Sequence, residues 1–125
     1  MNATLLVMAG GAIGAAGRYH LGRLVFQLGP MGYPLGTLVA NLMGGVLMGV
    51  LAGVLARSNF VDEPWRLLLG VGLLGGFTTF SAFSLEVINM IERNEWSMAI
   101  GYALLSVVGS VLALFAGLMA VRALA

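Results

Sequence analysis

The sequence predicts an all-α membrane protein with four transmembrane helices in one domain that covers residues 1–125. Hydrophobic residues make up 60% of the chain and charged residues only 9%. An ordinary soluble domain has about 45–50% apolar and about 25% charged residues. Because a soluble chain of this length has too much surface for its volume to hide that apolar content, lipid is expected to surround most of it.

Four stretches reach the length of about 20 mainly apolar residues that a helix needs to cross the hydrocarbon layer. The predicted helices cover, approximately, residues 3–26, 34–56, 65–91 and 96–121. No charged residue occurs from Leu24 to Ala56 or from Trp96 to Val121. The connecting segments are short, and they contain glycine, proline or charged residues, which favour turns.

The first stretch could also be interpreted as a secretory signal peptide. However, no positive charge precedes its apolar part, and Arg18 and Arg23 lie within the same span. We therefore favour a first transmembrane helix over a signal peptide.

The arginines leave the orientation in the membrane open. If the four helices alternate in direction, three arginines lie on the side of the termini and three lie towards the other side: Arg57, Arg66 and Arg122 against Arg18, Arg23 and Arg93. An excess of positive charge on one side normally sets the topology. The balance has two interpretations: another factor decides the orientation, or copies insert both ways up and pair antiparallel.

Composition also argues against several classes of protein. The chain has no cysteine and one histidine, so neither a disulfide framework nor a thiolate or histidine metal cluster is expected. It has no lysine, and its six arginines form no run, so nucleic acid is not an expected partner. No nucleophile–base pair is visible, and an enzyme is not expected.

Small residues recur every four positions on three of the predicted helices. The stripes are Gly10 and Gly14 on the first, Gly45, Gly49 and Gly53 on the second, and Gly109, Ala113 and Gly117 on the fourth. Such stripes let a neighbouring backbone approach closely, either within one bundle or between copies. Since four helices alone enclose little room for a pathway, we expect a homodimer.

Polar side chains at membrane depth are costly, so each one needs a reason. Arg18 could extend to the interface or line an aqueous vestibule that attracts anions. The amide of Asn41 could donate to an anion or join two helices. Three hydroxyls spaced by four residues form a ladder on one face of the fourth helix: Tyr102, Ser106 and Ser110. Each could donate to an anion or to a carbonyl of its own helix.

The third helix contains two glycines and two threonines near its middle, in the sequence GGFTTFSAFSLE at residues 75–86. These residues are weak helix formers, and they predict either a break or a kink with close packing. Carbonyls freed by a break can coordinate a cation. Phe80, Phe83 and Glu86 follow at intervals of three on one face. The edge of an aromatic ring is positively charged and can contact an anion, although aromatic stripes also serve packing.

Three motifs carry a resemblance to a known family: GGAIGA at residues 10–15 with Arg18 and Tyr19, GTLVAN at 36–41 with Gly44, and GGFTTFSAFS at 75–84 with Glu86. On these motifs the chain resembles the Fluc, or CrcB, fluoride channels over essentially its whole length. The third motif is the most specific. The departures are small: Ala40 stands where the family often has valine, and Phe77 follows the two glycines.

The resemblance implies a passive, fluoride-selective channel in the cell inner membrane that lowers cytoplasmic fluoride and confers resistance. It implies a dual-topology antiparallel homodimer with two pores. The implied pore residues are Asn41, Phe80, Phe83, Tyr102, Ser106, Ser110, Thr37, Thr79, Ser84 and Glu86. Arg18 would lie near a vestibule. Backbone carbonyls of Gly75 and Thr78 from both subunits would hold one structural sodium ion, which is not transported.

Two other classes remain as alternatives. A proton-coupled exporter similar to the small multidrug resistance proteins would also have four helices and dual topology, but it needs a carboxylate inside the first helix, which this chain lacks. A structural subunit of a larger membrane complex would need neither the hydroxyl ladder nor the double-phenylalanine motif.

Overall fold

The structure is a computed structural model, and it describes residues 2–28, 34–57 and 63–124. The described part contains helices and no strands, in the order α1 (Ala3–Leu28), α2 (Leu35–Arg57), α3 (Glu63–Trp65), the π-helix η1 (Arg66–Leu74), α4 (Gly75–Phe77), α5 (Ser81–Glu92) and α6 (Trp96–Ala123). The all-α prediction is confirmed.

Within the described ranges, three helical stretches are long and apolar enough to cross a membrane by length and composition: Leu35–Arg57, Arg66–Glu92 and Trp96–Ala123. The 26-residue helix α1 is long enough for a crossing as well. It is not among the three, and its second half carries the polar residues Arg18, His20 and Arg23.

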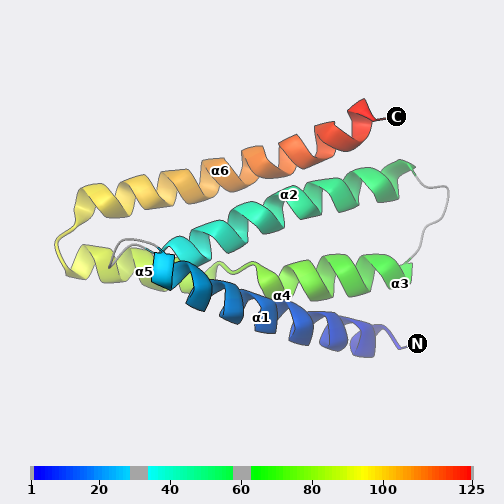
Figure 1. Cartoon of the computed structure of the whole chain (residues 1–125), viewed down its shortest axis with the longest axis horizontal. Helices are drawn as coiled ribbons and strands as arrows, with labels where there is room; N and C mark the ends of the chain where they lie inside the picture. Colours follow the sequence, from blue (N-terminus) through cyan, green and yellow to red (C-terminus); the bar gives the residue numbers. More distant parts are fainter. Residues whose placement is uncertain (1, 29–33, 58–62, 125) are drawn as a thin grey trace.

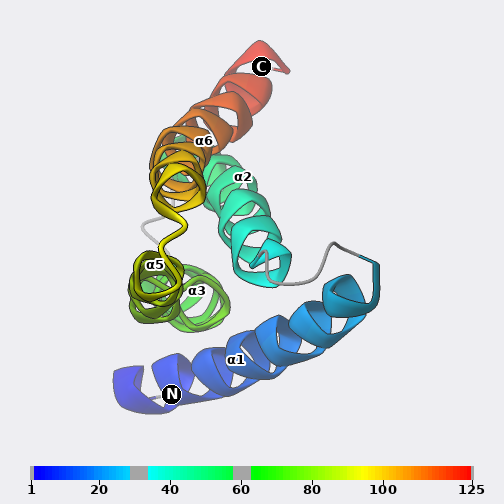
Figure 2. The ribbon, with the colours of Figure 1, turned by 90° about the vertical axis from the view of Figure 1, so that its left-hand side faces the viewer.

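The long helices run roughly alongside one another, and both termini lie at the same end (Figure 1). Helix α6 lies along α2, whereas α1 lies across η1 and α4 (Figures 1 and 2). The side chain of Arg57, at the end of α2, donates a 2.9 Å hydrogen bond to the carbonyl of Val121 near the end of α6. A positive charge at the carboxyl ends of two helices is favourable for both helix dipoles.

The small-residue stripes of all three helices face other helices of the same chain. A Cβ at Gly49 would collide with the carbonyl oxygen of Leu114, and one at Gly117 would collide with that of Val46. The stripe of α1 works in the same way, because a Cβ at Gly14 would collide with the Leu73 carbonyl. The stripes therefore build the fold of one chain, and they give no support to the expected homodimer.

The third long helix is not one regular α-helix. It starts as a π-helix, continues through α4, is interrupted at residues 78–80, and resumes as α5. At the end of the π-helix the Gly75 N–H is bonded to the carbonyl of Gly70, five residues earlier. The interruption lies inside the glycine- and threonine-rich motif, where the sequence predicts a break. The π-helix was not predicted, because an apolar run without clear periodicity does not distinguish five-residue from four-residue hydrogen bonding.

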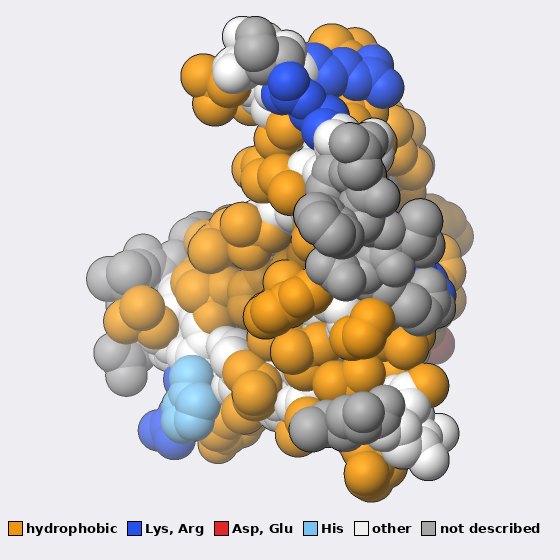
Figure 3. Space-filling view, turned by 90° about the vertical axis from the view of Figure 1, so that its right-hand side faces the viewer, with side chains coloured by type: hydrophobic (Ala, Val, Ile, Leu, Met, Phe, Trp, Pro, Cys, Tyr) orange, Lys and Arg blue, Asp and Glu red, His pale blue; other side chains and the backbone are white. Residues whose placement is uncertain are grey.

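A small core lies where α2, α5 and α6 meet. Its buried members are Leu38, Phe83, Met90, Ala99 and Tyr102. Outside it, most large hydrophobic side chains are exposed, including many along α6. Figure 3 shows hydrophobic side chains over much of the described surface at the end with the termini. This distribution is the reverse of that in a soluble protein, and it suits a lipid environment.

Candidate functional site

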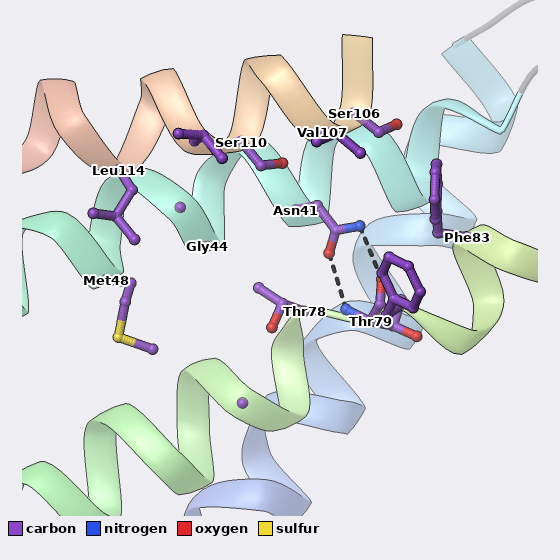
Figure 4. Close-up of a pocket in the computed structure, with 14 residues that line it drawn as sticks. Asn41, Gly44, Met48, Thr78, Thr79, Phe83, Ser106, Val107, Ser110 and Leu114 are labelled. Carbon is purple, nitrogen blue, oxygen red and sulfur yellow. Dashed lines mark hydrogen bonds between the residues drawn. The ribbon is translucent and has the colours of Figure 1, made fainter. Parts of the chain in front are cut away.

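An open cavity of about 570 Å³ lies between the α2–α6 pair and the interruption of the third helix (Figure 4). It is lined by Asn41, Gly44, Gly45, Met48, Gly75, Thr78, Thr79, Phe80, Phe83, Ser106, Val107, Ser110, Val111 and Leu114. The cavity therefore brings together eight residues that the sequence singles out: Asn41, Gly75, Thr78, Thr79, Phe80, Phe83, Ser106 and Ser110.

The amide of Asn41 reaches from α2 to the interruption and binds the backbone of Thr79 twice. Its Nδ2 donates to the Thr79 carbonyl at 3.0 Å, and its Oδ1 accepts from the Thr79 N–H at 2.9 Å (Figure 4). Of the two interpretations open for Asn41, the structure shows the one in which the amide joins two helices. The amide nitrogen carries a second hydrogen, which leaves one donor for a ligand.

The hydroxyls beside the interruption are bonded to nearby groups of the same helix. Thr79 Oγ1 accepts a 3.2 Å hydrogen bond from the N–H of Ala82, in the first turn of α5. Thr78 Oγ1 donates to the carbonyl of Leu74, and Ser84 Oγ donates to that of Phe80, both at 2.9 Å. Thr78 and Ser84 thus use their hydroxyl donors within the helix, as such residues commonly do.

Three aromatic rings follow one another from the cavity into the core. The rings of Phe80 and Phe83 lie 5.4 Å apart, and those of Phe83 and Tyr102 lie 5.3 Å apart, each pair tilted by 45°. Phe80 is 74% exposed, whereas Phe83 is 8% exposed and Tyr102 is fully buried. Tyr102 does not line the cavity; it lies behind Phe83.

The other two members of the hydroxyl ladder do lie on the cavity wall. Ser106 and Ser110 are one turn apart on α6, facing the interruption (Figure 4). Ser106 is 5% exposed, and its hydroxyl has no hydrogen-bond partner among the described residues. An unpaired buried hydroxyl is unfavourable by about 1–3 kcal/mol, so a ligand or water at this position would satisfy it.

Three further predicted site residues, like Tyr102 and Ser84, are not among those that line the cavity. The hydroxyl of Thr37 donates to the carboxylate of Glu86 at 2.6 Å, between α2 and α5. Arg18 is on α1, on the glycine-lined face; its Nε is buried and has no hydrogen-bond partner within the described part of the chain.

The apolar lining was not predicted. Met48, Val107, Val111 and Leu114 line the cavity together with the polar residues. Val107, Val111 and Leu114 are spaced by four and three residues beside the serine ladder. That spacing places the three side chains on one face of the helix, but a face in contact with lipid would show the same spacing. Gly44 was noted only as part of a motif, although a Cβ there would collide with Thr78 Cγ2.

The chemistry of the site is that of neutral donors. No group of three or more His, Cys, Asp or Glu side chains that could hold a metal occurs in the described ranges. The polar groups on the cavity are hydroxyls, one amide and backbone groups. A hard cation there could be held only by oxygen atoms such as backbone carbonyls, and a small anion by hydroxyl and amide hydrogens.

The comparison with known families agrees with the motif resemblance. The family model described as "CrcB-like protein, Camphor Resistance (CrcB)" matches residues 5–118. Curated relatives with the name "Fluoride-specific ion channel FluC" match nearly the whole chain. The one from Phenylobacterium zucineum is 60% identical over 124 residues, which are 98% of this chain and 97% of the relative.

Two further relatives with that name are about equally distant. The protein of Caulobacter vibrioides is 50% identical over 123 residues, covering 98% of this chain and 97% of the relative. That of Novosphingobium aromaticivorans is 52% identical over 127 residues, covering 100% of both chains. The chain therefore belongs to the CrcB-like protein family and is a multi-pass membrane protein.

Proposed function

We propose that this chain is a fluoride-selective channel of the cell membrane that lets fluoride leave the cell passively. Its relatives carry the name of fluoride-specific channels at up to 60% identity. The observation that carries the proposal is the buried, unpaired hydroxyl of Ser106 on the cavity wall, one turn from Ser110. Passive flow of an ion makes and breaks no covalent bond, so the proposed channel is not an enzyme.

The physical problem is to replace the water around a small, strongly hydrated anion. Ser106 and Ser110 supply hydroxyl donors, and the second N–H of Asn41 supplies another. The exposed Phe80 and the buried Phe83 can present their positive ring edges. None of these groups carries a full charge, so each binds fluoride weakly enough to release it, as conduction requires.

Export needs no energy source beyond the membrane potential. Hydrogen fluoride is a weak acid that enters the cell and dissociates there. The negative interior then drives the anion outward, with about 2.3 kcal/mol per charge for every 100 mV. Passive release thereby lowers cytoplasmic fluoride and gives resistance to it.

We further propose that two copies pair with opposite orientations in the membrane, with all four long helices crossing it. The cavity of one copy is open, and Phe80 at its edge is exposed, so a second copy would complete the wall. The balance of the arginines between the two ends of the helices supports this pairing. Arg57, Arg66 and Arg122 belong to the end with the termini, and Arg18, Arg23 and Arg93 lie towards the other end. Neither orientation is then favoured.

A structural sodium ion completes the proposal. The carbonyls of Gly75 and Thr78 are uncharged hard-oxygen donors, which suit sodium, and both residues line the cavity. Two carbonyls are too few for one sodium ion, and a second copy would add two more. The ion would neutralise the carbonyl dipoles of the two interruptions and hold the copies together.

The direct test is ion release from liposomes that contain the purified protein. We expect rapid fluoride efflux and little chloride efflux, read with ion-selective electrodes. Equal release of both anions would contradict the selectivity, and no release of either would contradict the channel.

The paired arrangement is tested separately. A single cysteine is added after Ala125, since the natural chain has none, and is labelled in whole cells with a membrane-impermeant maleimide. Opposite insertion predicts that about half of the copies are labelled. Labelling of all copies or of none would overturn the dual topology.

A further inference from the structure

We propose that the side chains of Asn41 and Thr79 are positioning residues that keep the Gly75 and Thr78 carbonyls free for the cation. The inference rests on the proposed function, because it concerns the sodium site of that channel. It goes further in naming the groups that create the site. Two backbone N–H groups at the interruption use side-chain acceptors in place of these carbonyls.

The first N–H belongs to Thr79. In a continuous α-helix, this N–H would donate to the carbonyl four residues earlier, which is that of Gly75. Here it donates instead to Asn41 Oδ1 at 2.9 Å. The amide oxygen of α2 thus replaces the Gly75 carbonyl as the acceptor, and that carbonyl is left without its helical donor.

The second N–H belongs to Ala82. Its helical acceptor would be the carbonyl of Thr78. It donates instead to Thr79 Oγ1 at 3.2 Å. This is the capping arrangement by which a threonine hydroxyl satisfies an N–H in the first turn of a helix. The Thr78 carbonyl is released in the same way as that of Gly75.

Two contacts from α2 hold the extended backbone in place. Asn41 Nδ2 donates to the Thr79 carbonyl at 3.0 Å, so one amide fixes both backbone groups of that residue. Gly44, one turn later, leaves room for the methyl group of Thr78, whose backbone is extended with ψ of 157°. The four interactions together select the two carbonyls that the sequence resemblance assigns to sodium.

The consequence is that the sodium site depends on a hydroxyl and an amide that do not themselves contact the ion. If either acceptor is removed, the corresponding N–H has only its helical carbonyl left to bond. That carbonyl is then turned into the helix and withdrawn from the cation. Loss of a group that orients a metal ligand usually lowers affinity by about 10–100-fold.

The experiment compares Thr79→Val with Thr79→Ser. Valine keeps the shape of threonine but removes the acceptor, whereas serine keeps the hydroxyl. The purified proteins are melted in detergent over a series of NaCl concentrations, with N-methylglucamine chloride keeping the ionic strength constant. A ligand that binds the folded state raises the melting temperature with its concentration. We expect wild type and Thr79→Ser to share one sodium midpoint, and Thr79→Val to need at least about 10-fold more sodium.

Ser84→Ala is the matched control, because it removes a hydroxyl that bonds to the Phe80 carbonyl and leaves both released carbonyls unchanged. Its sodium midpoint should equal that of wild type. Asn41→Leu is the second variant, kept in case Thr79→Val cannot be purified, and it should also raise the midpoint. Equal midpoints for Thr79→Val and Thr79→Ser, or no response of the wild type to sodium, would overturn the proposal. Fluoride release is not part of this readout, so a sodium response without fluoride efflux would reject only the channel.

Discussion

The hydroxyl of Thr37 donates a 2.6 Å hydrogen bond to the carboxylate of Glu86 and so joins the first turns of α2 to the middle of α5. Both side chains are partly buried. The bond gives the carboxylate a donor at a depth where an unpaired charge is unfavourable. It also holds α5, which carries Phe83, against α2.

We therefore expect Thr37→Val to lower the free energy of unfolding by about 1–3 kcal/mol, because the carboxylate loses its donor. Denaturation with sodium dodecyl sulfate, followed by tryptophan fluorescence, measures the change. Thr37→Ser retains the hydroxyl and should behave as wild type. A Thr37→Val protein as stable as Thr37→Ser would show that the hydrogen bond contributes nothing.

Replacement by isoleucine should have the same effect on fluoride efflux at Phe80 and Phe83, but different effects on stability. Both Phe80→Ile and Phe83→Ile remove an aromatic edge, and we expect each to abolish fluoride efflux from liposomes. Phe80 is 74% exposed, so Phe80→Ile should leave the melting temperature nearly unchanged. Phe83 packs on Tyr102 in the core, and its replacement should lower stability by about 1–3 kcal/mol.

Size-exclusion chromatography of both variants checks that assembly is preserved. Unchanged efflux in both variants would remove the rings from the pathway.

Ser106→Ala tests whether the Ser106 hydroxyl binds a ligand or stabilises the fold. The hydroxyl has no partner among the residues described, so its removal should not lower the melting temperature measured without fluoride. A lost hydrogen bond to a charged ligand weakens binding by about 1.5–3 kcal/mol, so fluoride efflux should fall by about 10-fold or more. A clear loss of stability in fluoride-free buffer would instead indicate a structural role.

Gly49→Ala tests the close approach of α2 and α6. The added methyl group would collide with the Leu114 carbonyl, which is backbone and cannot rotate away. We expect a loss of about 1–3 kcal/mol in the free energy of unfolding. Gly101→Ala, on α6, is the control, because nothing lies within 4 Å of its added Cβ. Since alanine favours a helix over glycine, that variant should be equal to wild type or slightly more stable.

The overall architecture could be predicted because composition and span length are properties of the chain itself. A 60% apolar chain of four long stretches leaves little choice besides membrane helices. The interruption near Thr78 could also be predicted from the sequence, since two glycines and two threonines weaken a helix wherever it lies. The family resemblance rested on this motif and two others, and the comparisons confirm it.

The partners of individual side chains could not be predicted in this way. Asn41 fits an anion contact and a helix contact equally well in the sequence, and only the position of Thr79 decides between them. From the sequence, Gly49 could equally well contact a second copy or Leu114 of its own chain. The pairing of Thr37 with Glu86 joins residues 49 positions apart. These contacts depend on how the helices are rotated about their axes. A uniformly apolar helix has no amphipathic pattern from which that rotation can be predicted.

The inward-facing glycines have a consequence for how freely the sequence can change. Because every small-residue stripe is used within the chain, the outer face of α6 consists of side chains such as Leu105, Val108 and Leu112, which are all exposed. Acyl chains do not distinguish one branched aliphatic group from another. The exterior of the protein should therefore accept exchanges among leucine, isoleucine and valine over long evolutionary times. Gly49 and Gly117, in contrast, should accept almost no substitution.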